Sequence, residues 1–145
     1  QRSLSSMQLR YEHQSQSAIK LLNWLKQQKE FVQVLHPSDE ASAGHTYWKE
    51  VCKKGHSAGL VSVILDPKYT LEDVRKFCDA LTLFKLGFSW GGPVSLVMLY
   101  NLNEMRSLEH THLKQGFLVR FCIGLEHSED LIQDIENAIK TLNKP

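Results

Sequence analysis

Two short stretches of this chain combine apolar residues with polar groups that could do chemistry. Residues 86–96 include Ser89 and Trp90, which come directly before the glycine pair Gly91-Gly92. Residues 116–126 place a single arginine, Arg120, inside an apolar run. A glycine pair permits backbone angles closed to other residues and lets a ligand approach the main chain. Each stretch is predicted to be a short strand that carries one polar feature.

Arg120 is the first candidate for ligand binding. A buried arginine is costly unless an opposite charge pairs with it. That charge belongs either to a protein carboxylate, which makes Arg120 structural, or to a ligand carboxylate, which a guanidinium grips with two parallel hydrogen bonds. Trp90 has two interpretations as well, because a tryptophan is either a core residue or, together with Ser89, part of a pocket lining. The residues alone leave both alternatives open.

Metal-binding and nucleophilic sites are weakly supported by the sequence. His110 and His112 would face the same way on a strand, and Cys52 lies four residues from His56. Neither pair has an evident third and fourth ligand. No serine, cysteine or histidine shows the spacing of a catalytic triad. We therefore expect no metal and no nucleophilic centre in this chain.

The composition is that of one globular domain. The chain has 145 residues, of which 42% are hydrophobic and 23% charged, and its formal charge is +1. This charge gives no electrostatic basis for binding nucleic acid or a membrane surface. The cysteines are odd in number and widely spaced, which fits the reducing cytoplasm, and we expect all of them to be small core residues: Cys52, Cys78 and Cys122. Because the first residue is a glutamine, we expect a fragment of a longer protein.

The elements that must position Arg120 follow an α+β order. Apolar periodicity predicts helices over residues 2–28, 45–51, 71–81 and 128–142, and strands over residues 31–35, 59–65, 95–100 and 118–123. Residues 101–115 are interpreted as a surface loop, and Thr70 as the N-cap of the third helix. The predicted fold is α+β, a small antiparallel or mixed sheet with helices packed on one face and a long N-terminal helix.

The N-terminal helix is predicted to pack through one apolar face. The polar run at residues 13–17 is interpreted as a wetter middle of this helix. The residues expected on the apolar face are Leu4, Met7, Tyr11, Ala18, Leu21, Leu22 and Leu25.

The two chemistry-bearing stretches resemble the C-terminal domain of the Cys/Met-metabolism family of pyridoxal-phosphate (PLP) enzymes, and most closely its bacterial cystathionine β-lyases. The family pattern is aromatic-Ser-Trp-Gly-Gly, here residues 88–92, followed by Arg-x-x-Ile-Gly-Leu-Glu, here residues 120–126. The resemblance extends to residues 2–10 and to the strand end at His36-Pro37, and so covers most of the chain. The chain departs from the pattern at Pro93-Val94, where the family often has Tyr-Glu, and this departure lies at the expected rim of the substrate pocket.

This resemblance implies a PLP-dependent carbon–sulfur lyase of methionine biosynthesis that cleaves L-cystathionine to homocysteine, pyruvate and ammonia. It implies that Arg120 binds the α-carboxylate of the substrate and that Ser89 and Trp90 shape the pocket. Residues 1–28 would form an interdomain helix and residues 29–145 the rest of a small domain in a cytoplasmic homotetramer. The PLP-binding domain and its lysine would lie upstream, so we expect the chain alone to bind no PLP and to be inactive.

Three alternatives accompany this interpretation. Lys53 and Lys54 superficially match the PLP lysine of the family, but they precede an apolar strand, which is the wrong context. A sibling transsulfuration enzyme, a γ-lyase or γ-synthase, is the nearest alternative function, and tryptophan at position 90 favours β-elimination over it. A non-catalytic interaction domain is the alternative of another class, and the presence of Arg120 together with Ser89 and Trp90 speaks against it.

Overall fold

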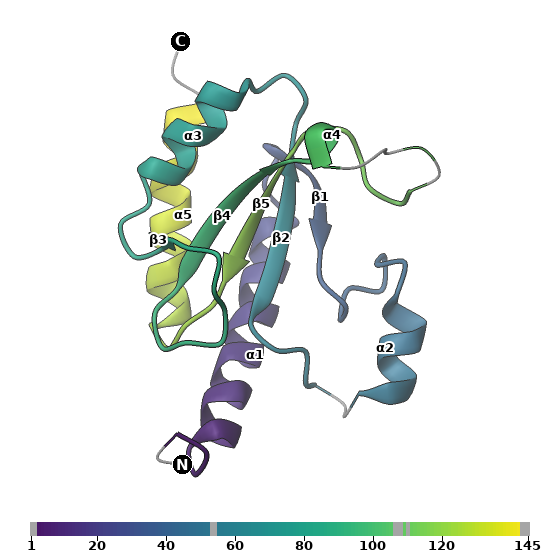
Figure 1. Cartoon of the computed structure of the whole chain (residues 1–145), viewed down its shortest axis with the longest axis vertical. Helices are drawn as coiled ribbons and strands as arrows, with labels where there is room; N and C mark the ends of the chain where they lie inside the picture. The colour runs from purple at the N-terminus through teal and green to yellow at the C-terminus, as the bar shows by residue number, and fades with distance from the viewer. Residues whose placement is uncertain (1–2, 53–54, 106–108, 110, 143–145) are drawn as a thin grey trace.

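A five-stranded sheet with helices packed on one of its faces forms the body of the protein (Figure 1). The structure is a computed structural model that describes residues 3–52, 55–105, 109 and 111–142. The elements in chain order are α1 (Met7–Leu25), β1 (Phe31–Leu35), α2 (His45–Val51), β2 (Leu60–Leu65), α3 (Leu71–Asp79), β3 (Lys85–Leu86), β4 (Leu96–Asn101), α4 (Leu102–Met105), β5 (Phe117–Cys122) and α5 (Ser128–Leu142).

The strands lie in the order β1-β2-β5-β4-β3. All neighbouring pairs are antiparallel except β3 and β4, which run parallel, so the sheet is mixed, as predicted. Strand β5 is central, and its register places Arg120 opposite Ser62 of β2 and Met98 of β4.

The core lies between this sheet and three helices. Helices α1 and α5 pass behind the sheet (Figure 1), and α3 packs on α5 and β4. Val119 and Phe121 of β5 are fully buried in this layer. Because successive side chains of a strand point to opposite faces, Arg120 projects from the other face, which no helix of this layer covers.

Helices α3 and α5 match the sequence prediction closely. Thr70 caps α3 through a capping box, in which the Asp73 amide donates to Thr70 Oγ1 at 3.2 Å and the Thr70 amide donates to Asp73 Oδ2 at 2.8 Å. The predicted inner face of α5 is buried against the sheet: Leu131, Ile135, Ala138, Ile139 and Leu142.

The N-terminal helix departs from the prediction in both its start and its packing. Helix α1 begins at Met7, and the side chains of Leu4, Met7 and Tyr11 are exposed rather than on the inner face. Gln14, Ser15 and Ser17, predicted to lie in a wetter middle, are buried instead. The polar groups of Gln14 and Ser15 bind loops that lie far away in sequence, which a helical pattern cannot reveal.

Two further predictions need correction. Residues 86–96 do not form one strand, because β3 ends at Leu86, β4 begins at Leu96, and the residues between them form a loop. Residues 101–115 contain the short helix α4 as well as loop.

Cys52 is exposed, whereas Cys78 and Cys122 are buried as expected. Cys52 follows α2, which lies beyond β1 away from the main helical layer (Figure 1) and has no buried residue. Within the part of the chain that the structure describes, no helix is long and apolar enough to cross a membrane.

Candidate functional site

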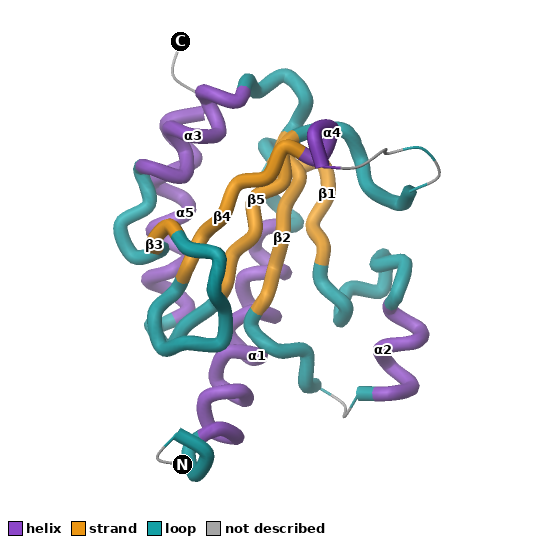
Figure 2. The backbone as a smooth tube through the Cα atoms, viewed as in Figure 1, coloured by secondary structure: helices purple, strands orange, loops and turns teal. Residues whose placement is uncertain are grey.

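Arg120 projects from the open face of the sheet and binds the backbone of the loop that joins β3 to β4. Its Nη2 donates to the carbonyl oxygen of Phe88 at 2.8 Å, and at 3.4 Å to those of Gly87 and Ser89. We call residues 87–95 the 87–95 loop, and Figure 2 shows this segment crossing in front of the sheet after β3. The loop carbonyls therefore fix the direction of the guanidinium.

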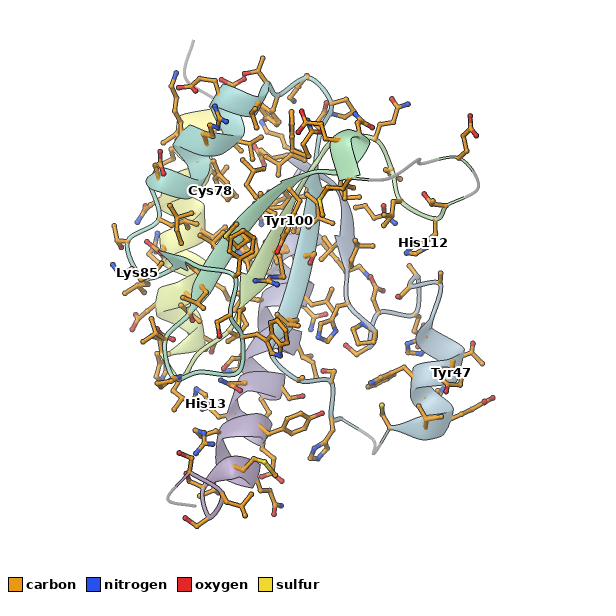
Figure 3. The ribbon with its side chains drawn as sticks, in the orientation of Figure 1. His13, Tyr47, Cys78, Lys85, Tyr100 and His112 are labelled. Atoms are coloured by element: carbon orange, nitrogen blue, oxygen red, sulfur yellow. The ribbon has the colours of Figure 1, made fainter. Side chains whose placement is uncertain are left out.

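The positive charge of Arg120 has no carboxylate partner in the described part of the chain, since none of the ion pairs found there includes it. Its guanidinium carbon lies 5.8 Å from the ring centroid of Tyr100, which Figure 3 places over the sheet. Its Nε is buried and has no hydrogen-bond partner among the described residues. A guanidinium with a buried, unused donor and no counter-ion favours the ligand interpretation over a structural salt bridge.

Ser89 and Trp90 are both exposed, and they serve the site in different ways. Ser89 contributes its carbonyl oxygen to Arg120. The Trp90 side chain is 66% exposed, so it is not a core residue. It lines a cavity of about 260 Å³ that we call the Trp90 cavity, lined by Tyr11, Gln14, Ala58, Gly59, Leu60, Trp90, Gly91 and Cys122.

Helix α1 holds the walls of this cavity through its buried polar side chains. Gln14 Nε2 donates to the carbonyl oxygen of Gly92 at 2.7 Å. Ser15 Oγ accepts from the amide of Ser57 at 2.9 Å, and so fastens the loop before β2. The polar run of α1 thus positions two loops that meet at the Trp90 cavity.

The motif residues after β5 grip the end of the 87–95 loop. Glu126 accepts from the Ser95 amide at 2.8 Å and from Ser95 Oγ at 2.7 Å. The Gly124 amide donates to Ser95 Oγ at 2.8 Å, and the Leu125 amide to the Pro93 carbonyl oxygen at 2.8 Å. Glu126 belongs to the motif, but its role is not evident from the sequence, because its partner Ser95 lies 31 positions away.

The close contact between residues 124–126 and the end of the 87–95 loop requires a glycine at position 124. A Cβ at position 124 would lie 2.5 Å from both the Pro93 carbonyl oxygen and Glu126 Oε2, closer than real Cβ contacts allow. The Ile-Gly-Leu-Glu sequence therefore combines a buried Ile123, a residue without a side chain and a carboxylate that binds the neighbouring loop.

The described lining of the Trp90 cavity, which does not include Arg120, contains no side chain that could form a Schiff base with PLP. No lysine lines the Trp90 cavity among the residues that the structure describes there. The Lys85 amine donates to the Thr82 carbonyl oxygen at the β3 edge of the sheet. Lys53 and Lys54 lie outside the described residues.

The alternative chemistries gain no support from the described residues. They contain no group of three or more His, Cys, Asp or Glu side chains that could hold a metal ion. His56 stacks on Tyr11 with ring centroids 5.6 Å apart, and His110 lies outside the described residues. Burial raises the pKa of the Cys122 thiol in the Trp90 cavity, which keeps it protonated and unreactive at neutral pH.

Comparison with known proteins shows related enzymes of more than one activity. The chain is similar to a cystathionine beta-lyase of Bordetella avium, with 34% identity over 138 residues that cover 95% of this chain and 34% of that protein. It is 31% identical over 142 residues to an L-alanine/L-glutamate racemase of Wolbachia pipientis wMel, covering 97% of this chain and 34% of that protein. Thus the chain spans about a third of the length of the curated relatives it matches.

A solved structure and a family model agree with these relatives. The O-acetylhomoserine sulfhydrylase of Wolinella succinogenes matches with a TM-score of 0.79 and 27% identity, covering 94% of this chain and 36% of that one. The family model described as Cys/Met metabolism PLP-dependent enzyme matches residues 1–140. Since this match includes Arg120 and the loop that holds it, the chain belongs to the Cys/Met metabolism family of PLP-dependent enzymes.

Proposed function

We propose that this chain is the C-terminal small domain of a PLP-dependent carbon–sulfur lyase that cleaves L-cystathionine to homocysteine, pyruvate and ammonia. In this proposal Arg120 binds the α-carboxylate of the substrate. The observation that carries the proposal is the guanidinium of Arg120, which has a buried unused donor and no carboxylate partner in the described chain. The cystathionine beta-lyase relative and the one-third coverage of that relative support it.

The chain contributes by fixing the charged end of the substrate. Arg120 keeps one nitrogen on the loop carbonyls, while its remaining N–H groups are free to grip a carboxylate. An arginine suits this position better than a lysine, because it presents a planar fork and no amine that could compete for an aldehyde cofactor. Holding the carboxylate restricts rotation of the substrate, so that the reacting bonds keep one orientation.

The cofactor chemistry would come from the rest of the protein. PLP, when bound there, supplies the electron sink for breaking bonds at the α and β carbons of an amino acid. Trp90, the tryptophan of a motif that resembles that of the bacterial β-lyases, supports β-elimination as the specific reaction. The racemase and sulfhydrylase among the similar proteins keep sibling reactions open as the second candidate.

Turnover of L-cystathionine by the full-length protein that carries this sequence tests the proposal. We expect pyruvate as the keto-acid product, and we expect Arg120→Gln to lower kcat/KM by roughly 30-fold or more, because removing one partner of a charged hydrogen-bonded pair costs about 2 kcal/mol or more. Arg120→Lys is the matched variant that keeps the charge but loses the fork.

The keto acid that is released distinguishes the alternative reactions. Release of 2-oxobutyrate instead of pyruvate would assign γ-elimination, and the absence of any turnover would exclude both eliminations, leaving a sibling reaction on another substrate or an interaction domain. If Arg120→Gln retained wild-type kcat/KM, the carboxylate role of Arg120 would be wrong whatever the product.

A further inference from the structure

We propose that Glu126 is a positioning residue for carboxylate recognition, because it fixes the 87–95 loop whose carbonyl groups hold Arg120. The effect on ligand binding rests on the proposed function of Arg120. The effect on the loop and on the guanidinium itself does not, because it follows from the contacts of the free chain.

The carboxylate of Glu126 is committed to one residue of the loop. Its two oxygens accept from the amide and the hydroxyl of Ser95 at 2.8 and 2.7 Å. Ser95 is 0% exposed, so water cannot replace these acceptors without opening the structure. Loss of the carboxylate would leave two buried donors without partners, which is costlier than the loss of an exposed hydrogen bond.

Ser95 closes the base of the 87–95 loop. Its carbonyl oxygen accepts from the Lys85 amide at 3.0 Å, on the strand that leads into the loop. Its hydroxyl accepts from the Gly124 amide at 2.8 Å, just after β5. Ser95, the last residue of the loop, is therefore bonded both to β3, which precedes the loop, and to the segment that follows β5. Glu126 holds Ser95 in place.

Arg120 depends on this loop for its orientation. The hydrogen bonds of its Nη2 go to the carbonyl oxygens of Gly87, Phe88 and Ser89, which all lie within the loop. When the loop base loosens, these carbonyls move, and the guanidinium loses the contacts that aim it. Glu126 thus acts on the ligand site through Ser95, without touching the ligand.

The chain offers a chemically matched control in Asp73. Its Oδ2 accepts from the amide of Thr70 at 2.8 Å and from Thr70 Oγ1 at 2.7 Å, so a carboxylate binds the same two kinds of donor as Glu126 does, but at an exposed position. Asp73 caps α3, and its side-chain hydrogen bonds go to Thr70 rather than to the 87–95 loop. Asp73→Ala should lower stability without changing the loop.

The test uses the ¹⁵N-labelled chain and the variants Glu126→Ala, Glu126→Gln and Asp73→Ala. Amide hydrogen exchange of residues 87–95 and the heteronuclear NOE of the Arg120 Nε–H group are measured first, and L-cystathionine is then titrated in. We expect Glu126→Ala to speed exchange in the loop by tenfold or more, to lower the Arg120 NOE and to weaken the response to L-cystathionine. Glu126→Gln should be intermediate, because its amide oxygen still accepts from one donor, and Asp73→Ala should match the wild type in all three.

The outcomes separate this inference from the proposed function. Unchanged loop exchange and an unchanged Arg120 NOE in Glu126→Ala would overturn the inference, as would a loosened loop with unaltered affinity for L-cystathionine. If Glu126→Ala does not fold, the comparison between Glu126→Gln and the wild type decides in the same way. A wild-type chain in which Arg120 does not respond to L-cystathionine would contradict the proposed function, while the measurements on the free chain still decide whether Glu126 positions Arg120.

Discussion

The carbonyl oxygen of Phe88 accepts a hydrogen bond from Arg120 Nη2 at 2.8 Å, so the loop between β3 and β4 and the central strand β5 hold each other. This contact explains why an arginine without a carboxylate partner is stable on the open face of the sheet. Backbone carbonyls carry partial negative charge and satisfy one nitrogen, and the Tyr100 ring offers a favourable surface to the cation. The positive charge itself stays available to an anionic ligand.

We predict that Trp90 serves ligand binding and not stability. Because its side chain is 66% exposed, Trp90→Ala should change the free energy of unfolding by no more than about 0.5 kcal/mol. Phe121→Ala, at a side chain that is 0% exposed in the same sheet, should cost about 3–5 kcal/mol. Urea denaturation of both variants checks this contrast. A loss near 2 kcal/mol or more for Trp90→Ala would mean that Trp90 is a core residue after all.

We predict that Gly124→Ala destabilises the chain through steric overlap. The added Cβ would meet the Pro93 carbonyl oxygen and Glu126 Oε2 at 2.5 Å, and forcing them apart should cost about 1–3 kcal/mol. Gly44→Ala is the matched control, because a Cβ at position 44 meets nothing within 4 Å, and its cost should stay below about 1 kcal/mol. Thermal unfolding of the two variants makes the comparison, and equal melting temperatures would show that the grip on Pro93 yields easily.

We predict that the stability of the chain falls as the pH drops from about 6.5 to about 4, through His36. Burial lowers the pKa of His36 from 6.5 to about 4, against a smaller opposite effect of Asp39. The unfolded chain therefore takes up a proton at His36 throughout this window while the folded chain does not, so acidification favours unfolding until the pH reaches the folded pKa. Below that pH the His36 contribution is constant.

The His36→Asn variant isolates this effect. Asparagine keeps an acceptor near the position of Nδ1, which accepts from the Ser38 amide at 3.3 Å, but it does not titrate. Asp39 titrates at a lower pH than this window. Burial would raise the pKa of Asp39, but the hydrogen bond and the charge of Lys26 lower it below 3.8. The difference in unfolding free energy between wild type and variant should therefore depend on pH between 4 and 6.5. If the two chains showed parallel pH profiles across that range, His36 would not be the titrating group.

Local sequence patterns predicted the elements whose partners are local or periodic. Helix α3 was identifiable because Thr70 and Asp73 are three residues apart, and α5 because its apolar residues recur at helical spacing. The candidate ligand-binding residue of strand β5 was identifiable because one charged residue, Arg120, interrupts an apolar run. Alternation along that strand then decides which face the arginine occupies.

The remaining features depend on partners distant in sequence. Gln14 is buried on α1 because it binds the carbonyl oxygen of Gly92, 78 positions away. The stretch before Gly92 was predicted as a strand, but its carbonyls bind Arg120 instead of a neighbouring strand. The role of Glu126 was hidden for the same reason, since nothing near it in the sequence indicates that Ser95 is its partner.

The most direct test of the central claim is a titration of the ¹⁵N-labelled chain, followed through the Arg120 Nε–H signal. L-cystathionine is compared with the same molecule in which both carboxylates are converted to amides. We predict a saturable shift of the Arg120 signal with L-cystathionine and a much weaker shift with the amide. In Arg120→Gln, which lacks this signal, L-cystathionine should shift none of the other signals that respond in the wild type. Equal responses to the acid and the amide, or an Arg120 signal that neither compound moves, would contradict the assignment of Arg120 as the carboxylate-binding residue.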